Sequence, residues 1–161
     1  MKDTNLWIMC GPPGCGKSYF AKNVFITDDS WQYISRDEVR FSMLGENDEY
    51  FSKEKKVFNE FCDRIIYALG CDEYHNVIAD ATHLNEASRM KLINRVCPNE
   101  MGVKVFCVYF NTPEHICQER NKQRKGRAVV PADVIHKMYL SRTHPAKDHF
   151  KYAGILEVSG T

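Results

Sequence analysis

The sequence predicts an α/β fold with a mostly parallel central sheet of about five strands flanked by helices. Two observations favour this class. Short apolar runs typical of buried strands alternate along the chain with segments whose apolar residues recur at helical spacing. The first apolar run leads directly into a glycine-rich loop and then into a helical pattern, as in a unit of parallel sheet and helix.

Composition predicts one domain, residues 1–161, with a single core. The chain has 161 residues, of which 43% are hydrophobic and 27% are charged. No apolar run approaches the roughly 20 residues that a membrane span requires, and the N-terminus lacks a secretory pattern. The formal net charge is only +1, so nucleic-acid binding would need a local basic patch rather than an overall field.

The seven cysteines are an odd number and form no C-x-x-C pair. This usage predicts neither a disulfide framework nor a structural zinc site. Reduced thiols are the simpler interpretation, and they predict a cytoplasmic protein.

Five strands are predicted, at residues 5–10, 32–34, 76–80, 103–110 and 154–158. The longest helical pattern lies between the second and third strands, where Phe58, Phe61 and Ile65 share one face. We expect Ser52 to cap that helix and Gly70 to end it.

Three further helices have start signals. We expect Asn85 to cap a helix that runs through Val96. Thr112 is expected to be an N-cap that Pro113 follows in the first turn, and Pro131 is expected to open the last helix. With these helices between the strands, the order of elements is that of an alternating α/β chain.

The glycine-rich loop fits the phosphate-loop pattern G-x-x-x-x-G-K-[S/T] at every fixed position. Its glycines let backbone amides turn toward phosphate oxygens, Lys17 would reach the β- and γ-phosphates, and Ser18 would ligate Mg²⁺. The alternative is a Gly/Pro-rich turn before a helix. We predict binding of ATP with Mg²⁺ by this loop and the residue after it, Gly11, Pro12, Pro13, Gly14, Cys15, Gly16, Lys17, Ser18 and Tyr19.

A second polar segment, residues 35–40, follows the second strand. Since functional groups gather beyond the carboxyl ends of parallel strands, this segment should face the phosphate loop. Asp37 would accept a proton from an attacking hydroxyl, and Arg40 would bind an anionic part of the acceptor. Alternatively, Ser35 and Glu38 form a capping box and Asp37 only complements the helix N-terminus. The two interpretations are compatible.

Two more features suit phosphate chemistry. Asp80 ends an apolar strand, where it would orient Mg²⁺ through water, although an aspartate there can also simply cap a turn. Five basic residues fall within residues 120–127, either as a solvated helix end or as a lid that hinges at Gly126.

Taken together, four blocks resemble the 5′-polynucleotide kinase family. These are the phosphate loop, the S-R-D-x-x-R of residues 35–40, residues 77–85, and residues 120–131. The third block is similar to a family strand that ends in D-x-T-N-L-N, with His83 in place of the usual asparagine. The resemblance spans residues 6–141 and implies a P-loop phosphotransferase fold with an arginine-rich lid at about 120–131.

The resemblance implies ATP-dependent phosphorylation of 5′-hydroxyl ends of DNA or RNA, in a bacterial or infected host cell. Asp37 would be the general base, and Arg40 would hold the 3′-phosphate of the acceptor. The lid would supply cations to the donor phosphates, with Arg124 as the transition-state contact. The implied lid cations are Arg120, Arg124 and Arg127, and the implied lining of the acceptor path is Thr82, His83 and Asn85.

Many members of that family carry a phosphatase domain after the kinase, and this sequence has no counterpart. If the protein acts in end repair, we expect a separate 3′-phosphatase and a ligase as partners. Two other functions remain open. One is a kinase of the same fold that acts on a nucleoside, nucleotide, sugar or metabolite. The other is a nucleotide-switched ATPase, because the phosphate loop also resembles loops of the ring-forming ATPases associated with diverse activities.

Overall fold

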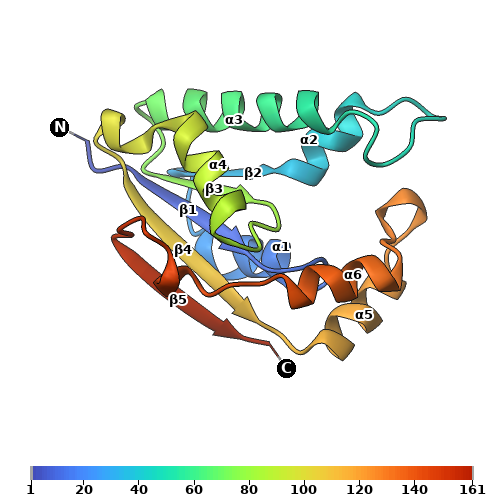
Figure 1. The fold of residues 1–161 in the computed structure, drawn as a ribbon. Coiled ribbons are helices and arrows are strands. Elements are labelled where there is room, and N and C mark those ends of the chain that lie inside the picture. The colour runs from blue at the N-terminus through green and yellow to red at the C-terminus, as the bar shows by residue number, and fades with distance from the viewer. Residues whose placement is uncertain (1, 161) are drawn as a thin grey trace.

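Five parallel strands form the centre of the computed structural model, which describes residues 2–160 (Figure 1). Their order across the sheet is β2-β3-β1-β4-β5. The strands are β1 (Asn5–Cys10), β2 (Trp31–Ser35), β3 (Asn76–Asp80), β4 (Lys104–Asn111) and β5 (Gly154–Ser159). The predicted five-stranded sheet is confirmed, and every predicted strand end lies within one residue of the observed end.

Helices connect the strands. They are α1 (Lys17–Phe20), α2 (Arg36–Met43), α3 (Glu54–Gly70), α4 (Glu86–Val96), α5 (Glu114–Lys122) and α6 (Ala132–Leu140). The first is short, and a π-helical turn (Ala21–Phe25) extends it. Short 3₁₀ turns occur at Pro98–Met101, Gly126–Ala128 and Pro145–Lys147. Among residues 2–160, no helix is long and apolar enough to cross a membrane.

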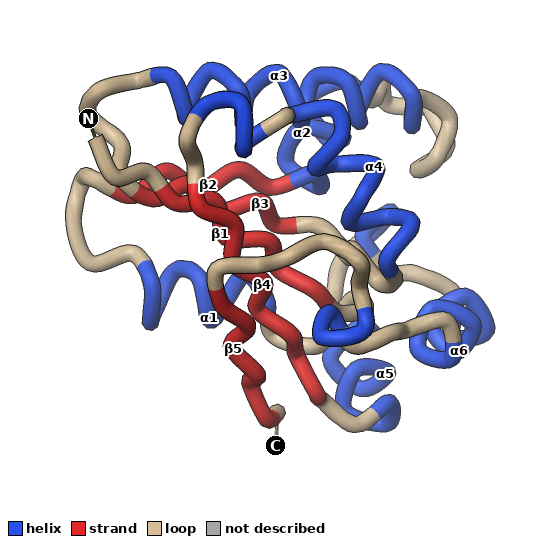
Figure 2. Tube along the Cα trace, turned by 60° about the vertical axis from the view of Figure 1, so that its left-hand side comes forward, coloured by secondary structure: helices blue, strands red, loops and turns tan. Residues whose placement is uncertain are grey.

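Helices cover both faces of the sheet, as Figure 2 shows for α3 on one side and α1 on the other. Alternation along the strands explains the two layers, since successive side chains point to opposite faces. In β1, Leu6 and Ile8 pack in a core with α3 and α4, whereas Met9 packs with residues of α5 and α6. At the centre of the sheet both faces are therefore covered, as is typical of a parallel sheet, whereas the edge strand β5 is largely exposed.

The helix starts agree only in part with their predicted caps. Asn85 accepts a hydrogen bond from the Ser88 amide in a capping box, as expected for α4. The predicted Ser52 cap is wrong, because its hydroxyl donates to the Glu49 carbonyl, 2.7 Å away, and α3 begins later. The predicted Thr112 cap is also wrong. Its hydroxyl donates to the Cys15 carbonyl at 2.8 Å and so ties the end of β4 to the phosphate loop.

A buried arginine anchors the segment before β5. The Arg89 side chain is fully buried and forms an ion pair with Asp148 through Nε (2.6 Å) and Nη2 (2.8 Å). Its guanidinium also donates to the carbonyls of His83 (2.9 Å) and Thr143 (3.1 Å). Arg89 thus joins the loop after β3 to the chain that returns to the sheet.

Candidate active site

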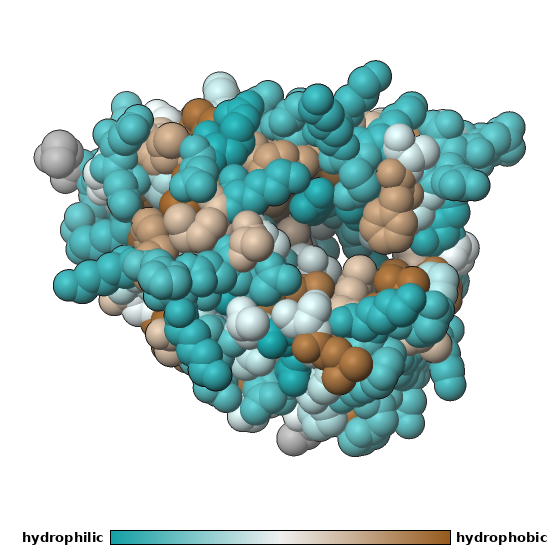
Figure 3. Space-filling view, in the orientation of Figure 1, coloured by the Kyte–Doolittle hydropathy of each residue, from teal (hydrophilic) through white to brown (hydrophobic). Residues whose placement is uncertain are grey.

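A cavity of about 570 Å³ opens at the carboxyl ends of β1, β2 and β3. Its size is ordinary for a small-molecule site. Figure 3 shows the hollow between the surface over α2 and the surface over α6. The phosphate loop, the start of α2, the end of β3 and residues of α5 and α6 all line it. The prediction that residues 35–40 face the phosphate loop is therefore confirmed.

Two glycines give the phosphate loop its shape. Gly14 has φ +82° and Gly16 has φ +104°, a region that other residues rarely adopt. A Cβ atom at Gly14 would also lie 2.4 Å from the Cys117 carbonyl oxygen. The predicted nucleotide residues that line the cavity are Pro13, Gly14, Gly16, Lys17, Ser18 and Tyr19, whereas Gly11, Pro12 and Cys15 are buried beneath it.

Lys17 supplies the positive charge of the loop. Its ammonium donates to the carbonyls of Gly11 (2.8 Å) and Pro12 (3.1 Å). Burial lowers the pKa of Lys17, but interactions with Cys15, Asp80 and Asp37 raise it by more, so the net direction is upward. The group is therefore charged at neutral pH, as binding of phosphate requires.

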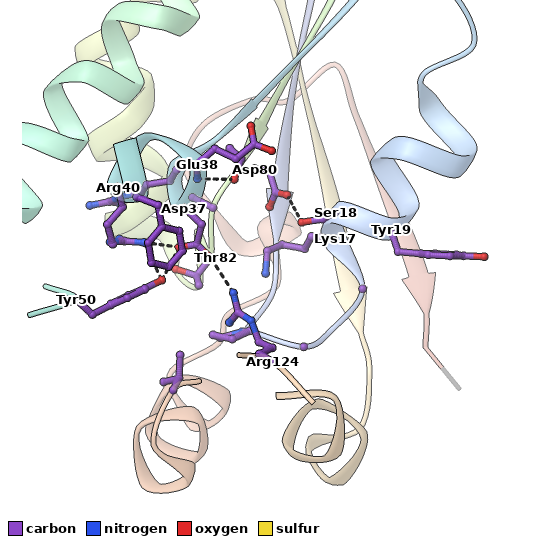
Figure 4. Close-up of a pocket in the computed structure, with 18 of the residues that line it drawn as sticks. Lys17, Ser18, Tyr19, Asp37, Glu38, Arg40, Tyr50, Asp80, Thr82 and Arg124 are labelled. Atoms are coloured by element: carbon purple, nitrogen blue, oxygen red, sulfur yellow. Dashed lines mark hydrogen bonds and ion pairs between the residues drawn. The ribbon is translucent and has the colours of Figure 1, made fainter. Parts of the chain in front are cut away.

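Oxygen atoms suited to Mg²⁺ meet beside the loop. Ser18 Oγ donates to Asp80 Oδ2 at 2.8 Å, which places a hydroxyl and a carboxylate together (Figure 4). Mg²⁺ prefers hard oxygen donors and commonly keeps water and substrate phosphate as its other ligands, so this pair fits the ion. The structure thus brings the two predicted metal residues, Ser18 and Asp80, together, and their role toward Mg²⁺ stays a prediction.

Tyr33 joins this pair, although the sequence analysis did not identify it. Its hydroxyl donates to Asp80 and lies 3.1 Å from Ser18 Oγ. Burial and the Asp80 carboxylate raise the pKa of Tyr33, so it remains a donor at neutral pH. Strand alternation was an available signal, because Tyr33 precedes Ser35 by two residues and Ser35 pairs with Asp80 across the sheet.

Asp37 lies at the centre of the cavity wall (Figure 4). Its Oδ1 accepts hydrogen bonds from Tyr50 and Arg40, and its Oδ2 accepts one from Arg124 at 3.0 Å. Burial raises the pKa of Asp37, but the Tyr50 hydrogen bond and then the two guanidinium charges lower it by more. The net pKa is below the usual value, so the side chain is an ionised, fixed carboxylate at neutral pH.

Arg40 lines the cavity beside Asp37, although its side chain is largely buried. It is 5% exposed, and its Nε donates to Glu54 Oε1 at 2.7 Å. Its Nη1 donates to the Tyr50 hydroxyl at 2.8 Å, and its guanidinium lies 4.3 Å from the centre of that ring. These contacts favour a positioning role toward Asp37. The predicted contact of Arg40 with an acceptor phosphate stays a prediction.

Tyr50 and Glu54 had no sequence signal. Both come more than ten residues after Asp37, where the sequence indicated only a loop and the start of a helix. Burial and the Asp37 carboxylate raise the pKa of Tyr50, which keeps its hydroxyl protonated. Glu54 binds Arg36 at 3.0 Å as well as Arg40. They complete a network that only the fold brings together.

The basic segment 120–131 places two of its three predicted arginines at the cavity. Arg120 and Arg124 line it, and Arg124 reaches across to Asp37 (Figure 4). Arg127 was expected at the donor phosphates, but it is not among the lining residues. Its Nη1 instead donates to the carbonyls of Gly45 (2.8 Å) and Asp48 (2.6 Å), which joins this segment to the loop between α2 and α3.

Asn121 fixes the base of the same segment. This residue is buried, its Nδ2 donates to the Val130 carbonyl at 2.6 Å, and its Oδ1 accepts from the Val130 amide at 3.0 Å. Between these anchor points Gly126 has φ +58°. The segment therefore has a closed base and a turn that favours glycine at its tip.

The residues expected along the acceptor path separate in the structure. Thr82 lines the cavity. His83 is 5% exposed, its Nδ1 lies 2.8 Å from the Met9 carbonyl, and burial lowers its pKa to about 3. Asn85 is the cap of α4. The structure therefore does not bring His83 or Asn85 to the cavity, because one is a neutral core residue and the other is engaged by its helix.

Several solved structures share this fold. A fungal RNA kinase has a TM-score of 0.68 and 13% identity, over 100% of this chain and 76% of its own. A chain of the Pnkp1/Rnl/Hen1 RNA repair complex has a TM-score of 0.72 and 24% identity, over 88% of this chain but only 44% of its own. A gluconokinase from Sinorhizobium meliloti 1021 has a TM-score of 0.60 and 15% identity, over 100% and 85%.

At these identities the likeness shows the fold alone, and the neighbours include kinases of RNA and of small molecules. The cavity, the phosphate loop and this likeness identify a P-loop kinase fold with a nucleotide site. A family model described as AAA domain matches residues 6–145, in agreement with the resemblance of the phosphate loop to those of AAA ATPases. The chain belongs to this AAA domain family.

Proposed function

We propose that this protein is an ATP-dependent kinase that transfers the γ-phosphate to 5′-hydroxyl ends of DNA or RNA. Residues 1–161 form one kinase domain, and residues 120–131 are its lid. The observation that carries the proposal is the ionised Asp37 carboxylate, fixed by Tyr50, Arg40 and Arg124 in the same cavity as the phosphate loop. A nucleotide switch without an acceptor has no need of such a group.

In this proposal the backbone amides of the phosphate loop and Lys17 bind the donor phosphates. Ser18 and Asp80 would hold Mg²⁺, which would supply positive charge to offset the negative charge of the donor phosphates. Asp37 orients the acceptor hydroxyl in line with the γ-phosphorus and takes its proton as the new oxygen–phosphorus bond forms. The bond between the γ-phosphorus and the bridging oxygen of ATP breaks in the same transfer, and ADP leaves. Arg124 pairs with Asp37 and lines the cavity, so its guanidinium would stabilise charge on the transferred group.

A small-molecule kinase is the second candidate, because the gluconokinase matches the whole chain. Transfer of labelled γ-phosphate from ATP·Mg²⁺ separates the two. The acceptors are a 5′-hydroxyl oligonucleotide, a nucleoside 3′-monophosphate, a plain nucleoside and gluconate. We expect label on the oligonucleotide above all. Label on gluconate or on the nucleoside alone would replace the proposal with the second candidate.

Under this proposal, other reactions act on the same nucleic-acid ends before or after the kinase. A kinase that creates 5′-phosphate ends supplies a ligase, and a 3′-phosphatase prepares the opposite end. We propose that separate proteins of these two classes act on the same ends.

Replacement of Tyr50 by phenylalanine tests how Asp37 is kept ionised. The Tyr50 hydrogen bond favours the carboxylate, so its loss raises the pKa of Asp37. Activity that needs the carboxylate is present above this pKa and is lost as the pH falls through it. The acid limb of the kcat/KM profile should therefore move to higher pH in Tyr50→Phe. An unmoved limb would show that Tyr50 does not act through Asp37.

Replacement of Asp80 by asparagine tests the metal site. We expect the Mg²⁺ concentration for half-maximal activity to rise by about tenfold, as is common when a group that holds or orients a metal ligand is changed. Titration of Mg²⁺ at fixed ATP measures it. Asp29→Asn, an exposed aspartate in the turn before β2, is the matched control. An unchanged Mg²⁺ requirement in Asp80→Asn would contradict the assignment.

A further inference from the structure

Three aromatic residues stand at the acceptor side of the cavity. Phe41 comes from α2, and Tyr50 and Phe51 come from the loop between α2 and α3. All three line the cavity. The Tyr50 ring centre lies 4.6 Å from that of Phe51 and 5.8 Å from that of Phe41, in edge contacts. We refer to Phe41, Tyr50 and Phe51 as the aromatic platform.

The platform is not explained by packing of the core. Phe41 is 38% exposed and Phe51 is 51% exposed, and neither belongs to the two apolar cores described for residues 2–160. Large apolar side chains exposed in a concave, otherwise charged site indicate binding of a ligand with an apolar surface. The platform is therefore suited to bind a flat or apolar group of the ligand.

The platform lies next to Asp37, the side chain that would bind the reacting hydroxyl. The Tyr50 hydroxyl donates to Asp37, so the platform begins one hydrogen bond from the carboxylate that takes the acceptor proton. In a nucleotide, the 5′-carbon and the base project from the same face of the sugar ring. A 5′-hydroxyl at Asp37 thus brings the base of the same nucleotide toward the platform.

The platform is also held in place. The Arg40 guanidinium lies over the Tyr50 ring at 4.3 Å and near the Phe51 ring at 5.6 Å. The same guanidinium binds Asp37 and Glu54. One buried cation thus contacts the carboxylate and two of the rings, so the groups that would bind the hydroxyl and the base are held by the same side chain.

We propose that the aromatic platform stacks the nucleobase of the nucleotide that carries the acceptor 5′-hydroxyl. The inference rests on the proposed function and deepens it. Every base has a π-face, so stacking of this kind is tolerant of sequence. A terminal base has an open π-face whether or not its edge is paired, so the platform can receive the end of a single strand or of a duplex.

The test compares the wild type with Phe51→Ala on two acceptors. One acceptor is a 5′-hydroxyl oligonucleotide, and the other is the same strand with an abasic first nucleotide. We expect Phe51→Ala to raise the KM of the intact strand about tenfold, since stacking of one base on an aromatic side chain contributes on this order. The KM of the abasic strand should be unchanged by the substitution. Phe51→Tyr, which keeps a ring, should restore the wild-type value.

Tyr67→Ala is the matched control, because Tyr67 is an exposed aromatic residue of α3 outside this cavity. It should change neither KM. An equal rise for both strands in Phe51→Ala would overturn the inference, because it would show a role without the base. No change for either strand would overturn it as well.

If the proposed function is wrong, the experiment gives a different result from those above. In that case the wild-type protein labels neither strand, and the inference falls with it.

A binding measurement gives an independent readout. We place the fluorescent base 2-aminopurine at the first nucleotide, where stacking quenches its emission. Quenching on addition of wild-type protein, and its loss in Phe51→Ala, is the expected result. The same probe at the far end of the strand should respond equally to both proteins. Equal quenching of the first-nucleotide probe by both proteins would contradict stacking on the platform.

Discussion

Asp37→Asn should lower the rate of phosphoryl transfer by about 10³-fold, within the range of general acid–base catalysis. The amide keeps the shape of the side chain but carries no charge and cannot take the proton of the acceptor. Because the phosphate loop is unchanged, the affinity for ATP should stay within about twofold of the wild type. Single-turnover transfer and equilibrium ATP binding measure the two quantities.

Asp72→Asn is the control, since Asp72 is an exposed aspartate in the turn before β3. It should transfer phosphate at the wild-type rate. If Asp37→Asn retained most of its activity, Asp37 would only complement the N-terminus of α2. That was the alternative that the sequence left open.

Arg89→Met should destabilise the protein by about 3–5 kcal/mol, because it leaves Asp148 as a buried charge without its partner. Methionine roughly fills the volume, so the loss reports the ion pair and its hydrogen bonds rather than a large cavity. Urea unfolding monitored by circular dichroism measures the change in the free energy of unfolding.

Arg64→Met provides the matched control. Arg64 pairs with Glu60 at 2.8 Å on the outer face of α3, and this exposed pair should contribute less than about 1 kcal/mol. The double variant Arg89→Met with Asp148→Asn should recover part of the lost stability, since no unpaired charge remains. A loss in Arg89→Met no larger than that in Arg64→Met would contradict the proposed anchor.

The sequence predicted the sheet and the phosphate loop well, because both depend on local patterns. The apolar runs of the strands and the positions of Gly14, Gly16 and Lys17 are set within a few residues. Asp37 and Asp80 could be placed near the loop because Asp37 follows one parallel strand and Asp80 ends another, and the carboxyl ends of such strands meet. These signals need no knowledge of side-chain contacts.

The network around Asp37 could not be predicted, because its members have no regular spacing. Tyr50 lies 13 residues after Asp37, and Arg124 lies 87 residues after it. Glu54 is the first residue of α3, a position that indicates only a favourable charge at a helix start. Their convergence depends on the course of the loop between α2 and α3, which composition does not specify.

The wrong or unmatched predictions share a cause. A residue that fits a local motif can instead form a contact with a distant part of the chain. The Thr112 hydroxyl, for example, binds the phosphate loop instead of capping α5. His83 stands where the resemblance has an asparagine, and its ring pairs with the Met9 carbonyl in the core. Arg127 belongs to the basic segment, but its guanidinium reaches the carbonyls of a neighbouring loop. Sequence position alone cannot distinguish these partners.

Transfer to matched oligonucleotides that differ only at the 5′ atom tests the central claim most directly. One strand ends in a 5′-hydroxyl and the other in a 5′-deoxy carbon, and each is incubated with the protein and γ-labelled ATP·Mg²⁺. The account predicts label on the first strand alone, at its 5′ end. Label on both strands, or on neither while ATP is bound, would contradict transfer to the 5′-hydroxyl.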